Sequence, residues 1–89
     1  MLRISKPEFD EQTVILRLEG QLVGPWVGEL RKTAENFQRN GHRLALDLVE
    51  VTFADNTGIG LLLHLQQQAV SLTNCSPFLE EQLKRALSL

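Results

Sequence analysis

Apolar and polar residues alternate in four parts of the chain, and a period of two residues is typical of a β-strand. The clearest cases are Val14, Leu16 and Leu18, and then Leu44, Leu46 and Leu48. Shorter cases lie at residues 2–4 and 70–72. The pattern therefore predicts four strands. Residues 7–12 are polar and include Pro7, so we expect a hairpin turn there, and we expect Gly20 to end the second strand.

Apolar residues recur at spacings of three and four in three other segments, which is the period of an amphipathic helix. The first stripe is Trp26, Leu30, Ala34 and Phe37, the second contains Ile59, Leu62 and Leu63, and the third contains Phe78, Leu79, Leu83 and Ala86. Pro25 and Pro77 suit the first helical position, Ser76 suits an N-cap, and Gly41 suits a helix end. We therefore expect three helices.

The predicted order of elements is β-β-α-β-α-β-α, which indicates an α/β fold with a mixed four-stranded sheet and packed helices. After the hairpin, strands alternate with helices, so these strands should run parallel. One side of the second strand carries Ile15, Arg17 and Glu19. We therefore expect one sheet face to be well covered and the other less so. Residues 1–89 are expected to form a single domain.

Charge, the length of apolar runs and the cysteine content argue against several classes of protein. The net charge is −2 and no basic run occurs, so we expect no nucleic-acid partner. The longest apolar window, residues 59–65, is far shorter than a membrane span, so no direct membrane insertion is expected. The N-terminus lacks the apolar core of a signal peptide. The one cysteine, Cys75, excludes an internal disulfide and suits a reducing compartment. We expect a cytoplasmic protein.

Residues 52–63, TFADNTGIGLLL, join a predicted strand to a predicted helix and concentrate the polar chemistry of the chain. Asp55, Asn56 or Thr57 can cap the helix, because a short side-chain oxygen accepts from an N–H group two or three residues on. Gly58 allows close approach of a backbone, either by a neighbouring strand or by a partner. A helix N-terminus also favours anions, but the spacing and lysine of a P-loop are absent. The segment is therefore either a simple cap or a binding site.

The run LALDLVEVTFADNTGIGLLLHL resembles the STAS domain, the sulfate-transporter and anti-sigma-factor-antagonist family. The segment LTNCSPFLEEQLKRAL is similar to the last strand and helix of that family, and EGQL lies at the position of its G-E-L-D turn. The resemblance covers nearly the whole chain. It implies a bacterial, cytoplasmic protein that works by binding other proteins. In the antagonist branch the partner is an anti-sigma factor that is also a serine kinase, and phosphorylation after the motif aspartate releases it, so transcription regulation is implied.

The chain departs from the antagonist pattern at two positions. The usual phospho-acceptor position falls on Asn56, which has no hydroxyl group, and the acidic residue of the G-E-L-D turn falls on Val23. Either the domain binds without a phosphorylation switch, which we favour, or the adjacent Thr57 is an alternative phospho-acceptor. A threonine in the first turn of a helix is more often a cap or a packing residue.

The resemblance and the residues together predict a partner-binding surface made of Asp55, Asn56, Thr57, Gly58, Val23 and Trp26. In this hypothesis Asp55 and Thr57 orient the loop, while Asn56 offers neutral hydrogen bonds. Trp26 suits a binding surface, although packing at the edge of the core is the alternative.

We predict no catalytic residue, no cofactor and no metal site. Cys75 precedes a helix but has no identifiable base, and neither His42 nor Cys75 stands at ligand spacing from His64. The leading hypothesis is a non-catalytic protein-binding regulatory module. The alternative is a cytoplasmic accessory subunit of a membrane transporter, of the anion or lipid-trafficking ABC type, because GLLLHL resembles the helix of the latter branch.

Overall fold

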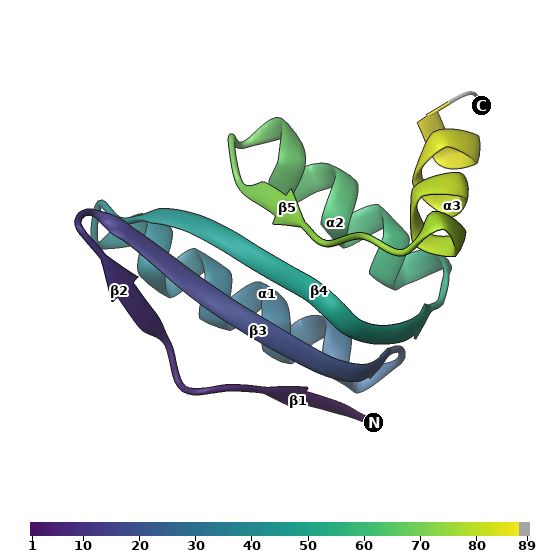
Figure 1. The fold of residues 1–89 in the computed structure, drawn as a ribbon, viewed down its shortest axis with the longest axis horizontal. Coiled ribbons are helices and arrows are strands. Elements are labelled where there is room, and N and C mark those ends of the chain that lie inside the picture. The colour runs from purple at the N-terminus through teal and green to yellow at the C-terminus, as the bar shows by residue number, and fades with distance from the viewer. Residues whose placement is uncertain (88–89) are drawn as a thin grey trace.

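A computed structural model describes residues 1–87, which form a five-stranded mixed sheet and three helices (Figure 1). The strands are β1 (Leu2–Ile4), β2 (Glu8–Asp10), β3 (Thr13–Leu22), β4 (Arg43–Ala54) and β5 (Ser71–Thr73). The helices are α1 (Pro25–Arg39), α2 (Asn56–Gln67) and α3 (Pro77–Leu87). The three predicted helices and the α/β class are confirmed.

The sheet has the strand order β1-β3-β4-β5, and β2 also pairs with β3. Strands β1 and β2 run antiparallel to β3, whereas β3, β4 and β5 are parallel to one another. The crossovers through α1 and α2 produce the parallel part, as the alternation of strands and helices predicts.

The N-terminal hairpin differs from the sequence-based prediction in two respects. Residues 8–10 form a fifth strand, β2, where we expected a polar turn, because Phe9 pairs with Val14 and its ring contacts Phe37 edge to face. Strand β3 also continues past Gly20 to Leu22, and the N–H of Gln21 donates to the carbonyl of Met1 at 2.8 Å. Both differences come from pairing between residues distant in sequence.

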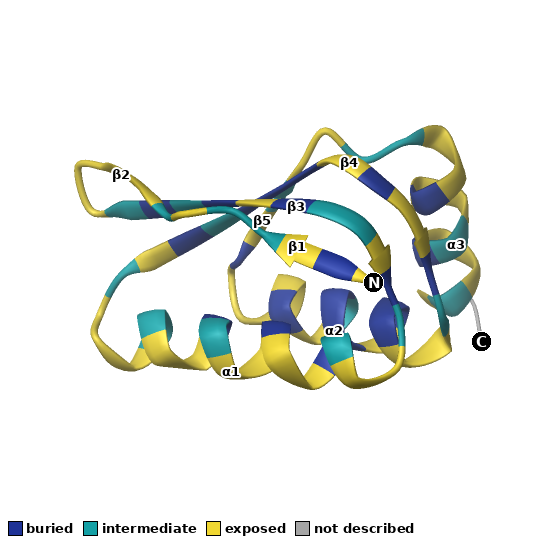
Figure 2. Cartoon of the chain, turned by 90° about the horizontal axis from the view of Figure 1, so that it is seen from below, coloured by how far each residue is buried: buried dark blue, intermediate teal, exposed yellow. Residues whose placement is uncertain are grey.

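The core lies between the sheet and the two helices α1 and α2, which cover the same face of the sheet (Figure 2). The inward side chains of β3 and β4, such as Leu16 and Leu46, are fully buried, as are Leu30 of α1 and Leu62 of α2. Burying one leucine side chain contributes about 1.5–3 kcal/mol. This inward row is the set of alternating leucines on which the strand predictions rest.

The opposite face of β3 has no helix over it among the described residues (Figure 2). We call this surface the open face; its central residues are Ile15, Arg17 and Asp47. Helix α3 lies beside α2 at the end of the sheet where β4 finishes (Figure 1). The prediction of one covered and one less covered face is therefore confirmed.

Candidate functional site

Asp55 caps helix α2 and is the centre of the predicted site. Its backbone is extended, with φ −80° and ψ −178°, and its Oδ1 accepts hydrogen bonds from the N–H of Gly58 at 2.8 Å and the hydroxyl of Thr57 at 2.7 Å. Its Oδ2 accepts from the N–H of Gly24 at 3.0 Å. These bonds, the one from Thr57 first, hold the pKa of the Asp55 carboxyl below its usual range because they favour the charged form.

The bond to Gly24 ties together two loops that are 31 residues apart in the sequence. Gly24 has φ +53° and ψ −130°, a conformation that residues with a side chain rarely adopt. Pro25 follows at the start of α1, and the N–H of Trp26 donates to the carbonyl of Val23 at 3.2 Å. We call the turn of residues 23–26 and the junction of residues 55–57 the loop pair. The structure thus places the predicted Val23 turn against the predicted Asp55 junction.

Asn56 and Thr57 are exposed in the first turn of α2. Asn56 also lines a shallow hollow of about 240 Å³ with Ile59 of α2 and Gln82 of α3. The side-chain oxygen of Gln82 is buried without a hydrogen-bond partner, while its amide donates to the carbonyl of Ala54 at 3.2 Å. The position predicted for docking therefore lies on the outside of the molecule, beside a groove between two helices.

Gly58, in contrast, is buried, and its surroundings favour the neighbouring-strand alternative for this glycine. A Cβ atom at this position would lie 2.5 Å from the carbonyl oxygen of Leu22, at the end of β3. The missing side chain therefore lets α2 pack against the end of β3. Gly58 also supports the loop pair, because its N–H donates to Asp55.

Trp26 is partly buried and packs against the core. It lines a mostly apolar hollow of about 370 Å³ with Leu2, Ile4, Pro25 and Glu29. Trp26 therefore packs at the edge of the core, the alternative expected from the sequence, and keeps part of its surface accessible within the loop pair.

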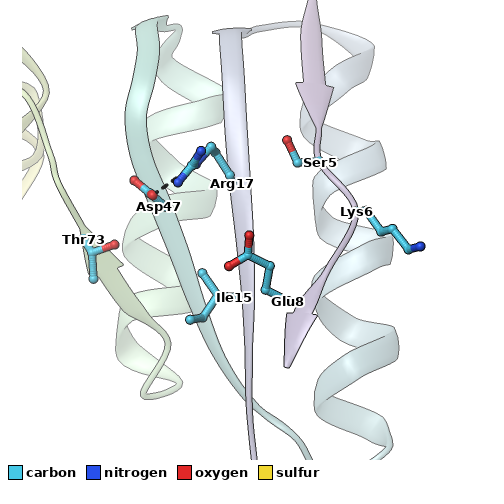
Figure 3. A pocket seen from close by; sticks show the side chains of 7 residues that line it. All are labelled: Ser5, Lys6, Glu8, Ile15, Arg17, Asp47 and Thr73. Carbon is cyan, nitrogen blue, oxygen red and sulfur yellow. Dashed lines mark hydrogen bonds and ion pairs between the residues drawn. The ribbon is translucent and has the colours of Figure 1, made fainter. Parts of the chain in front are cut away.

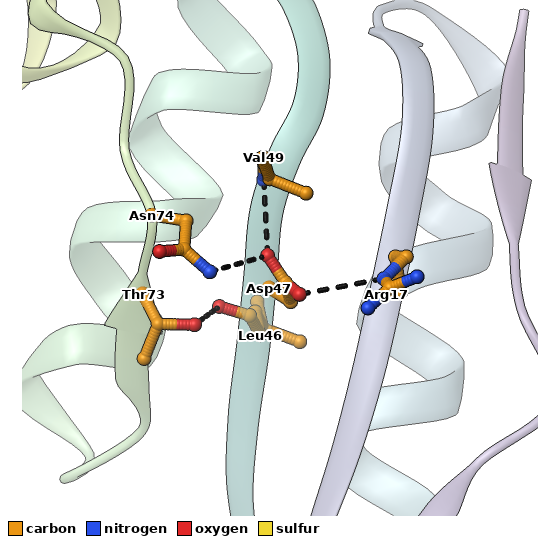
Figure 4. Close-up of polar contacts among 6 residues, drawn as sticks. All are labelled: Arg17, Leu46, Asp47, Val49, Thr73 and Asn74. Carbon is orange, nitrogen blue, oxygen red and sulfur yellow. Dashed lines mark hydrogen bonds and ion pairs between the residues drawn. The ribbon is translucent and has the colours of Figure 1, made fainter.

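Asp47 forms a second polar cluster on the open face (Figure 4). It accepts hydrogen bonds from the N–H of Val49 at 3.1 Å, the amide of Asn74 at 3.0 Å and Nε of Arg17 at 3.4 Å. The bond from Asn74, against partial desolvation, lowers the pKa of this carboxyl, and Val49 and Arg17 add to the effect. Asp47 thereby fastens the connection between β5 and α3 to β4.

Beside Asp47, the open face contains a hollow of about 500 Å³ that the sequence did not predict (Figure 3). Its lining residues come from four strands and the β1–β2 connection: Ser5, Lys6, Glu8, Ile15, Arg17, Asp47 and Thr73. In Figure 3 the carboxylate of Glu8 lies near Arg17, and Lys6 points away from the hollow. The sequence indicated only that the outward side of β3 is mixed in polarity. The pairing of Glu8 with Ile15, which brings β2 to this hollow, could not be predicted from the sequence.

Cys75 is a free, partly buried cysteine between β5 and α3. Burial, together with the Glu80 carboxylate, raises the pKa of the Cys75 thiol and so favours its protonated form. Among residues 1–87 no group of three or more His, Cys, Asp or Glu side chains is placed to hold a metal ion. Within the same residues, no helix has the length and apolar character to span a membrane.

Several solved structures have a similar architecture. The anti-sigma factor antagonist SpoIIAA in its unphosphorylated form superposes with a TM-score of 0.73 at 22% identity, over 94% of this chain and 82% of that chain. An antisigma-factor antagonist STAS domain from Rhodobacter sphaeroides gives 0.53 at 16% identity, over 85% and 92%. A crystal structure of Mglu gives 0.69 at 18% identity, over 83% of this chain and 20% of that one. These likenesses show the fold.

A comparison with curated proteins found no match. Residues 5–86 match the family model described as "Mlab, STAS domain". This match spans nearly the whole chain, including both loops of the loop pair and the Asp47 cluster. The chain therefore belongs to the STAS domain family, in the group that carries this description.

Proposed function

We propose that this domain is a non-catalytic regulatory module of the cytoplasm that binds another protein through the loop pair and the exposed first turn of α2. The main support for this proposal is the carboxylate of Asp55, which accepts hydrogen bonds from Gly24, Thr57 and Gly58. It holds two loops in one arrangement and leaves Asn56 exposed beside them. A surface fixed before binding loses less conformational entropy when a partner docks.

The partner in this proposal is a protein of the anti-sigma factor or serine-kinase type, because the fold is that of the antagonist SpoIIAA. Asn56 stands at the usual phospho-acceptor position and lacks a hydroxyl, so the domain is not switched by phosphorylation there. Thr57 is exposed, but its hydroxyl already donates to Asp55 at 2.7 Å. A phosphate at Thr57 would remove this donor and bring a charge of about −1.5 to −2 close to the Asp55 carboxylate.

The second candidate is an accessory subunit of a membrane transporter. Two observations favour it: the description "Mlab" of the matching family model, and the similarity of residues 60–65 to the helix of the lipid-trafficking branch. The same loop pair would then contact a transporter subunit.

Affinity purification of the tagged protein from its source cells separates the two candidates. Recovery of a kinase or anti-sigma factor supports the regulatory proposal, and recovery of an ATPase or permease supports the transporter subunit. If neither kind of protein is recovered, both candidate functions are contradicted. Intact-mass measurement of the same material is expected to show no added phosphate. A phosphate mapped to Thr57 would overturn the non-switched proposal.

A further inference from the structure

Three large apolar side chains are exposed where β4 approaches its end. Val49 is 53% exposed and Phe53 41% exposed, both on β4, and Phe78 at the start of α3 is 56% exposed. Contiguous exposed apolar surface on a small protein marks an interaction site, whereas single exposed residues do not.

Two hydrogen bonds align the start of α3 with β4. The side-chain amide of Asn74 donates to the carboxylate of Asp47. Further along both segments, the side-chain amide of Gln82 donates to the backbone carbonyl of Ala54. The segment between Asn74 and Gln82 therefore runs alongside the segment between Asp47 and Ala54. Phe78 falls within the first segment, and Val49 and Phe53 fall within the second.

Two carboxylates lie opposite each other next to these apolar residues. Glu19 of β3 is the register partner of Glu50 of β4, so both side chains are on the same face of the sheet. Like charges directly opposite on neighbouring strands are destabilising. The ion pairs within residues 1–87 involve Asp47 and Glu81, so neither Glu19 nor Glu50 is paired with a cation. Arg3 of β1 is the register partner of Glu19 on its other side, whereas Glu50 has no basic residue opposite it on a neighbouring strand.

The same part of β4 contains two irregularities. The pairing with β3 shifts between Arg17 and Glu19 and again between Gly20 and Gln21, and each shift adds one residue to β4. Such bulges redirect side chains and occur often beside functional sites. Both fall in the stretch that contains Val49, Glu50 and Phe53.

We propose that Val49, Glu50, Phe53, Glu19 and Phe78 form a second protein-binding surface that takes a basic amphipathic segment of a partner. We call it the acidic patch. Lysine or arginine side chains of the segment would face Glu19 and Glu50, and its apolar side chains would cover Val49, Phe53 and Phe78.

The charge of the surrounding face supports this choice of occupant. The outward strand positions carry Glu8, Asp10, Glu19, Asp47 and Glu50 against Arg3, Arg17 and Arg43, so carboxylates are in the majority. Two copies of this chain that meet through the patch would oppose the same carboxylates, which disfavours a symmetric dimer. This surface goes beyond the loop pair, and its test needs no knowledge of the partner proposed above.

The test is an NMR titration of the ¹⁵N-labelled protein with two synthetic amphipathic peptides. One contains lysine and leucine, and the other has every lysine replaced by glutamate. The lysine peptide is expected to shift the amide signals of Val49, Glu50, Phe53 and Phe78 and to bind less well at high salt. The glutamate peptide is expected to leave them in place. Shifts confined to the helical face, or equal binding of both peptides, would overturn the proposal.

Variants make the test specific. Glu50→Lys is expected to weaken binding of the lysine peptide by about tenfold, whereas Glu35→Lys, on the exposed side of α1, is the matched control and should leave it unchanged. Glu50→Gln, which removes the charge with little change in shape, should weaken binding in the same direction if Glu50→Lys folds poorly. Unchanged affinity in the folded Glu50 variants, or sedimentation showing a dimer that Glu50→Lys dissociates, would contradict the proposal.

Discussion

At the scale of single residues, Asp55 carries the arrangement of the candidate site, because one carboxylate joins the cap of α2 to the turn before α1. A capping residue was readable from the sequence, since Asp, Asn and Thr at a strand-helix junction favour an N-cap. Which of the three caps the helix was not readable. The bond to Gly24 depends on how β3 and β4 lie side by side, and this is a property of the fold.

We predict that Asp55→Ala lowers the melting temperature by several degrees, because Gly58 and Gly24 lose their acceptor. Asp55→Asn is the matched control. Its amide keeps one side-chain oxygen that can still accept a hydrogen bond, so Asp55→Asn should lose less stability than Asp55→Ala. Thermal unfolding followed by circular dichroism measures both. Equal stability of Asp55→Ala and the wild type would show that the carboxylate does not hold the two loops.

Asp47 gives a prediction about pH. Its pKa is lowered in the folded protein, so its contribution to stability is complete above the unfolded-state pKa of about 3.9 and is lost as the pH falls through the lower folded-state value. Asp47→Asn should therefore be less stable than the wild type at neutral pH, and the difference should shrink in acid. Urea unfolding at a series of pH values tests this. A stability difference that stays constant down to pH 2 would contradict it.

At the scale of elements, the glycines of α2 differ in what surrounds them. A Cβ at Gly58 would meet the carbonyl of Leu22 at 2.5 Å, whereas a Cβ at Gly60 would meet nothing within 4 Å. From the sequence both glycines weaken the helix equally. Only the packing of α2 on the end of β3 distinguishes them.

Alanine substitution at these two positions should change stability in opposite directions. Gly58→Ala is expected to cost about 1–3 kcal/mol through overpacking against β3, while Gly60→Ala should stabilise by up to about 1 kcal/mol through helix propensity. Denaturant titration of the two variants gives both values. If Gly58→Ala stabilised the protein as much as Gly60→Ala does, the close approach of α2 to β3 would be wrong.

The strand β2 shows where local pattern fails. Its sequence, EFD, is short and polar and follows Pro7, so it was predicted as part of a turn. Its strand conformation comes from pairing with Thr13, Val14 and Ile15. In the longer strands and helices the period of the apolar residues already specifies the buried face, and these elements were predicted with the correct order.

At the scale of the whole molecule, the fold separates two kinds of surface. The loop pair lies at the end of the sheet where β4 enters α2, and it offers hydrogen-bonding groups held in place by Asp55. The open face carries carboxylates and the hollow around Arg17. The residues of the loop pair could be selected from the sequence because they fall mainly in one contiguous motif, and their role in binding stays a prediction. The second surface depends on strand register and on the bulges in β4.

The most direct test of the proposed function is the affinity of the partner recovered by affinity purification for the wild type and for Asn56→Asp, measured by calorimetry. The new carboxylate would add charge to an exposed docking position at the start of α2, so we expect binding to weaken by about tenfold or more. The melting temperature should stay equal or rise slightly, because a negative charge is favourable at a helix N-terminus. Unchanged affinity in the folded Asn56→Asp protein would contradict docking at this position.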